Sequence, residues 1–118
     1  MENADGYVLT ASLMKWFWDF YADAASRTHP KASPLRAKDL STLPPAFVVT
    51  CQFDPLRDEG IAYAKAMAAA GVPVQQITAR GHTHTSLTMI DVVVSGMPVR
   101  AEMAGALRGF FSKSAVSA

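Results

Sequence analysis

Two apolar runs separated by an alanine-rich stretch constrain the fold of this 118-residue chain more than any other feature. Residues 46–51 are nearly all apolar or β-branched, which predicts a parallel strand buried on both faces. The alanine-rich stretch begins with Asp58 and Glu59, whose negative charge suits a helix N-terminus, and it ends at Gly71, a residue suited to the left-handed position after a helix. Residues 74–79 predict a second strand. This order predicts one right-handed βαβ unit and therefore an α/β fold.

The rest of the chain predicts further helices around this unit. Residues 11–25 carry more apolar side chains than one face of a helix can bury. Four prolines predict an irregular connector over residues 30–45. Pro98 suits the start of a last helix from residue 99 to about 112, with its apolar side chains on a buried face, and a short helix is expected over the apolar stretch 90–94.

A sheet of two strands is incomplete. Both outer edges of a two-stranded pair carry unpaired backbone N–H and C=O groups, and a stable sheet normally has more strands. Half of the residues are apolar, so the chain has apolar surface that something else is expected to cover. The sequence therefore predicts a partial α/β fold that is completed by other chain segments or by self-association.

Charge and composition exclude several function classes. The 11 basic and 10 acidic residues are mixed along the chain and give a net charge of +1, so nucleic acid is not an expected partner. No apolar run is long enough to span a membrane, and the polar, acidic first residues do not resemble a signal peptide. A single cysteine, Cys51, cannot form an intramolecular disulfide, which fits a reducing compartment. A cytoplasmic protein is expected.

A carboxylate and two histidines follow the predicted strands. Asp54 lies just beyond the first strand and is held in a turn by Pro55, while His82 and His84 follow the second strand. Parallel strands lie about 4.8 Å apart with their carboxyl ends at one edge, so side chains beyond those ends can meet. An aspartate that orients a histidine is two thirds of a hydrolytic triad in the chain order Ser, Asp, His. The alternative is an ordinary Asp-Pro turn beside surface histidines.

Other readings of these residues stay open. His82 and His84 could share a zinc ion, although no further ligands occur at a known spacing. His29, among prolines, is expected on the surface. The rings of Trp16 and Trp18 could line an acyl pocket, or they could serve only helix packing.

The nucleophile of a triad is missing from these 118 residues. No Gly-x-Ser-x-Gly motif occurs. Two valines precede Ser95-Gly96, and Ser86 lacks the sharp strand–helix turn that presents a catalytic serine. The chain alone is therefore expected to have negligible hydrolytic activity.

Several segments resemble one family closely. Residues 53–60 read Phe-Asp-Pro-Leu-Arg-Asp-Glu-Gly, residues 43–46 read Leu-Pro-Pro-Ala, and residues 69–74 read Ala-Ala-Gly-Val-Pro-Val. With the segments 6–10 and 14–21, these make nearly the whole chain similar to the C-terminal part of α/β-hydrolases of the hormone-sensitive-lipase-like esterase family. The resemblance implies a partial α/β-hydrolase fold, with residues 1–29 near the cap, 30–45 as connector, and 46–118 as the βαβ unit and last helix.

The resemblance also implies roles for single residues. Asp54 matches the family's triad acid. The family places its histidine three residues after a glycine, which here gives His84, although Thr85 and Ser86 replace the usual Gly-Phe that follows. The implied reaction is hydrolysis of a small or medium acyl ester, without a cofactor, by a serine outside these residues. A non-catalytic module that self-associates through its sheet edges is the alternative.

Overall fold

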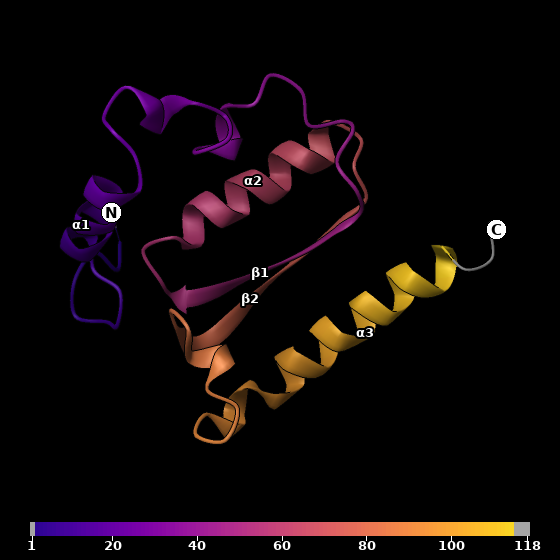
Figure 1. Cartoon of the computed structure of the whole chain (residues 1–118). Coiled ribbons are helices and arrows are strands. Elements are labelled where there is room, and N and C mark those ends of the chain that lie inside the picture. The colour runs from indigo at the N-terminus through magenta and orange to yellow at the C-terminus, as the bar shows by residue number, and fades with distance from the viewer. Residues whose placement is uncertain (1, 115–118) are drawn as a thin grey trace.

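A computed structural model describes residues 2–114 of the chain. Its α-helices and strands follow in the order α1 (Ala11–Tyr21), β1 (Ala46–Phe53), α2 (Arg57–Ala69), β2 (Val74–Thr83) and α3 (Met97–Ser114), with short 3-10 helices in the connecting segments (Figure 1). The strands pair in parallel, with α2 connecting them. This arrangement confirms the predicted α/β class with one βαβ unit. In the described part of the chain, no helix is both long and apolar enough to cross a membrane.

The second strand is longer than the sequence predicts because it contains a bulge. Pairing is regular up to Cys51 opposite Ala79 and resumes with Phe53 opposite Thr83, so β2 has two extra residues. Gly81 lies in this bulge with φ at +76°, a backbone conformation that glycine adopts without strain. The bulge keeps the strand ends paired, so both strands end at the same edge.

One face of the sheet packs against α2 (Figure 1). The core on this side centres on Leu40, Met67 and Val72, each at most 8 % exposed, so the connector is pinned by Leu40 as its apolar character suggests. Gly60 lets α2 approach the sheet closely, because a Cβ there would lie 2.8 Å from Cγ2 of Thr50. The hydroxyl of Thr50 forms hydrogen bonds across the sheet to β2, so both the methyl group and the hydroxyl of this side chain are held in place.

Two predicted helices differ from the structure. The first helix ends at Tyr21 instead of residue 25, because Ala22 turns to an extended conformation while its N–H still caps the Trp18 carbonyl. The helix expected over residues 90–94 is wrong: residues 90–93 form a turn that is closed by the N–H of Val93 on the Met89 carbonyl. This stretch is rich in β-branched side chains, which lose rotamer freedom in a helix.

The helix α3 lies on the side of the sheet opposite α2 (Figure 1). Several of its apolar side chains remain exposed, with Met103, Leu107 and Phe111 at 37, 54 and 74 %. The prediction of a buried face is wrong for these three side chains, whereas Phe110 is half-buried and α3 contacts β1.

The shape of the whole chain fits a partial fold. Its radius of gyration is 16.1 Å, whereas a compact domain of this length has about 13.5 Å. Its accessible surface is 8117 Å², against about 6,200 Å² for a folded monomer of this mass. The chain thus exposes surface that an independently folded domain would bury.

Replacing Gly60 tests the close approach of α2 to the sheet. We expect Gly60→Ala to lower the free energy of unfolding by about 1–2 kcal/mol, because overpacking outweighs the gain in helix propensity. Gly105→Ala in α3 is the matched control, since nothing lies within 4 Å of its added Cβ, and it should stabilise the chain by up to about 1 kcal/mol. Chemical denaturation measures both variants. A Gly60→Ala variant as stable as the parent would contradict the packing.

Candidate active site

The acid and one histidine that follow the two strands meet at the edge of the sheet. Asp54 is the first residue after β1 and is only 8 % exposed. Its Oδ1 accepts the backbone N–H of Leu56 at 2.8 Å, which fixes the carboxylate in the turn before α2. His84 is the first residue after β2, and its Nδ1 lies 2.8 Å from Oδ2 of Asp54. The structure therefore brings Asp54 together with His84.

This contact determines which nitrogen of the imidazole is free. A carboxylate only accepts hydrogen bonds, so Nδ1 of His84 carries the proton in the pair with Asp54. The neutral ring then has its lone pair on Nε2. The side chain of His84 is 31 % exposed, against 10 % for Asp54. The pair thus has a buried acceptor and an accessible base, and it can take up a proton at Nε2.

An open apolar pocket of about 580 Å³ lies next to His84. Trp18 lines this pocket together with other side chains from α1 and its flanks, among them Leu9, Met14 and Phe17. Trp16 is not among the lining residues. Its ring is half-exposed and packs on two neighbours of the same helix, with centroid distances of 5.2 Å to Phe17 and 4.7 Å to Phe20. The structure therefore separates the two tryptophans that the sequence treats alike.

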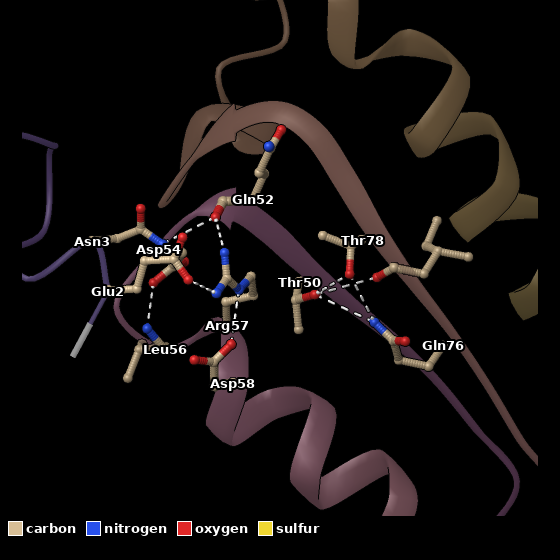
Figure 2. Close-up of polar contacts among 11 residues, drawn as sticks. Glu2, Asn3, Thr50, Gln52, Asp54, Leu56, Arg57, Asp58, Gln76 and Thr78 are labelled. Atoms are coloured by element: carbon tan, nitrogen blue, oxygen red, sulfur yellow. Dashed lines mark hydrogen bonds and ion pairs between the residues drawn. The ribbon is translucent and has the colours of Figure 1, made fainter.

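An arginine anchors the start of the chain beside the site (Figure 2). The Arg57 guanidinium donates to the Gln52 carbonyl at 3.1 Å and to Glu2 at 2.7 Å, and Asn3 donates to the same carbonyl at 3.2 Å. Hydrogen bonds to Asp58 and Glu2 raise the pKa of Arg57 further above its usual value, so its guanidinium is always charged. Sequence reasoning missed this role, although Arg57 belongs to the 53–60 string.

The second histidine has a different environment. His82 lies within β2, not in the loop beyond it, and is 6 % exposed. Its Nδ1 is 3.1 Å from Oγ of Ser86, whose hydroxyl donates to the Thr83 carbonyl at 2.8 Å. Since His82 and His84 have separate partners, they do not form one ligand pair. Within residues 2–114, no group of three His, Cys, Asp or Glu side chains is arranged to hold a metal ion.

The residue after His84 has a strained backbone. Thr85 has φ +61° and ψ −9°, the left-handed conformation. This conformation costs an L-residue roughly 1–2 kcal/mol, whereas glycine adopts it freely. The resembled family usually has glycine at this position. Thr85 therefore has the backbone conformation that a glycine would adopt without strain.

Neither nearby candidate nucleophile is activated by His84. Burial and the negative charge of Asp54 raise the pKa of the Cys51 thiol. The thiol is therefore protonated at neutral pH. The single hydroxyl proton of Ser86 is donated to the backbone of Thr83 rather than to His84.

The fold agrees with comparisons to known proteins. A family model described as alpha/beta hydrolase fold matches residues 1–88. Esterase LipI of Mycobacterium tuberculosis is 41 % identical over 94 residues, which are 78 % of this chain and 29 % of that protein. Ethyl acetate hydrolase of Pseudomonas putida is 38 % identical over 89 residues, 75 % of this chain and 28 % of that protein. The chain thus spans less than a third of the length of these relatives.

A solved structure matches almost the whole chain. The ester-hydrolase EH1AB1 from the metagenome of Lake Arreo superposes with a TM-score of 0.85 and 35 % identity, over 93 % of this chain and 35 % of that one. The chain belongs to the α/β-hydrolase fold family. Its resemblance to the hormone-sensitive-lipase-like carboxylesterases, and the partial α/β-hydrolase fold which that resemblance implies, are confirmed.

Proposed function

We propose that this chain supplies the acid and the base of a serine carboxylesterase triad. The 2.8 Å contact between Asp54 and His84, beside an apolar pocket, is the observation that carries the proposal. The nucleophilic serine comes from polypeptide outside these residues, since the 118 residues contain no Gly-x-Ser-x-Gly. Residues 1–118 then form the C-terminal part of the hydrolase domain, with the βαβ unit and α3 as its edge.

The proposed reaction is acyl transfer to water in two halves. The external serine hydroxyl attacks the ester carbonyl while Nε2 of His84 takes its proton. Asp54 stabilises the imidazolium that forms, and His84 then gives the proton to the departing alkoxide. In the second half Nε2 of His84 takes a proton from the water that attacks the acyl-enzyme, and it then gives this proton to the departing serine oxygen, which releases the acid and the free serine. Every proton passes through one nitrogen, so no cofactor is required.

The pocket supports a class of substrate, and the cysteine supports a cellular location. A 580 Å³ space with apolar walls suits a small or medium acyl group. The names of the relatives, an esterase and an ethyl acetate hydrolase, support this substrate class. Trp18 is the proposed acyl-contacting residue, and Trp16 has no support from the pocket. The single buried Cys51 fits the reducing cytoplasm, which is the proposed location.

A chimera tests the triad assignment. In it, residues 1–118 replace the matched portion of the Lake Arreo ester-hydrolase, and hydrolysis of p-nitrophenyl acetate is measured. We expect the chimera to be active and the 118-residue chain alone to give no burst. Asp54→Asn should lower kcat by about 10⁴-fold or more, because His84 is then no longer held in the catalytic tautomer. His84→Ala should lower kcat by at least as much, because it removes the base.

The matched control in the chimera is His29→Ala, which removes an exposed histidine far from the pair in sequence. Its kcat should stay within about twofold of the parent value, as is usual for a surface substitution. A folded His84→Ala chimera that keeps its activity would refute the assignment.

The two tryptophans provide a matched pair for the substrate pocket. In the same chimera, Trp18→Ala should raise KM for a p-nitrophenyl hexanoate by about tenfold, since that corresponds to losing roughly 1.4 kcal/mol of apolar contact. Trp16→Ala, on the same helix but outside the pocket, should change KM by less than about twofold. Equal effects of both substitutions would count against the proposed pocket.

A second candidate function is self-association, and the exposed surface favours it. The difference between 8117 Å² and the roughly 6,200 Å² expected is about 1,900 Å², which is more than the roughly 800 Å² that each partner buries in a standard protein interface. Two copies could pair through the open edges of β1 or β2. Sedimentation velocity at micromolar concentration should then show a dimer or larger species. A stable monomer under those conditions would exclude this function.

A further inference from the structure

The turn that carries His84 is held by side chains that the triad chemistry does not use. Thr85, directly after His84, has a left-handed backbone at φ +61°. A β-branched residue remains in such a conformation only where surrounding contacts hold it there. The contacts around Thr85 therefore determine where the preceding imidazole points.

A serine hydroxyl closes this turn. Ser86 Oγ donates to the Thr83 carbonyl at 2.8 Å. His84 and Thr85 lie between these two residues, so the bond closes the turn that contains them. Ser86 is only 8 % exposed, so water competes little for this bond.

Thr85 is also held locally, because its carbonyl accepts hydrogen bonds from the N–H and the hydroxyl of Thr88, but the Ser86 bond is the one that ties the turn back to the end of β2. Its loss would remove that restraint on the strained backbone of Thr85. The ring of His84 would then move relative to Asp54.

The second histidine ties this serine to the sheet. The hydroxyl of Ser86 has one proton, which goes to the Thr83 carbonyl, so its contact with His82 at 3.1 Å must use the N–H on Nδ1 of His82. His82 lies in β2 and is 6 % exposed. The turn is thus connected through Ser86 to a buried side chain of β2.

We propose that Ser86 and His82 are positioning residues, whose hydrogen bonds keep Thr85 in its left-handed conformation and thereby direct the imidazole of His84 onto Asp54. This inference rests on the proposed function, in which His84 is the base. Ser86 and His82 touch neither the substrate nor the reacting atoms. A serine that merely fills space in the core would have no effect specific to Thr85.

A glycine at position 85 separates these two roles. Glycine adopts the left-handed conformation without strain, so it does not need Ser86 to hold it. If Ser86 acts by restraining Thr85, then Thr85→Gly should rescue Ser86→Ala. If Ser86 only supports packing, the loss caused by Ser86→Ala should remain in the double variant.

The experiment uses the full chain with ¹⁵N-labelled histidine. Three histidines are present, and single substitutions assign their signals in NMR spectra. The ¹⁵N shifts report whether His84 is fixed in the tautomer with the proton on Nδ1. We expect this tautomer in the parent chain, its loss to a mixture in Ser86→Ala, and its return in the variant with both Ser86→Ala and Thr85→Gly. Ser112→Ala is the matched control, since it removes a similar hydroxyl-to-carbonyl bond of 2.7 Å on α3.

Each other outcome is decisive. A fixed His84 in Ser86→Ala, or no recovery in the double variant, would overturn the positioning role while leaving the triad proposal intact. If Ser86→Ala unfolds, a folded double variant with a fixed His84 supports the inference, and an unfolded one overturns it. A parent chain in which His84 is not fixed would instead overturn the proposed function itself.

Discussion

The parallel pairing of β1 with β2 is the constraint on which the candidate site depends. Asp54 and His84 are 30 residues apart in the chain, and neither has a local reason to approach the other. Because both strands run in the same direction and end at one edge, the first residue after each strand projects into the same space. The 2.8 Å contact of the pair follows from this topology together with the bulge that aligns the strand ends.

Around this pair, local contacts fix each partner separately. The backbone of Leu56 and the turn at Pro55 hold the carboxylate of Asp54, while the hydroxyl of Ser86 closes the turn that carries His84. The main apolar core lies on the α2 side, while α3 on the opposite side keeps apolar side chains such as Leu107 and Phe111 exposed.

Much of this could be predicted from the sequence, because it depends on short patterns. The apolar run of β1, the alanine-rich α2 with Gly71 after it, and the position of Asp54 all follow from local composition. The sequence could not show that β2 continues to Thr83, since a bulge depends on pairing with the other strand. For the same reason His82 looked like a loop residue, whereas pairing and burial give it a partner in Ser86.

The errors have physical causes as well. Apolar residues of α3 such as Leu107 and Phe111 suggested a buried face, but amphipathic character shows only that a face should be covered, not that this chain covers it. Trp16 and Trp18 differ by two positions on one helix, which places them on different sides. Periodicity alone did not identify which side faces the pocket, because that depends on where α1 lies relative to the sheet.

A double-mutant cycle on the unfolding free energy tests the contact between Asp54 and His84 most directly. The variants are Asp54→Asn, His84→Gln and their combination, with Asp54→Asn and His29→Gln as the control pair. A hydrogen bond that involves a carboxylate predicts a coupling of at least about 1 kcal/mol for the first pair and additivity for the control. A coupling for Asp54 and His84 below about 0.3 kcal/mol would contradict the account.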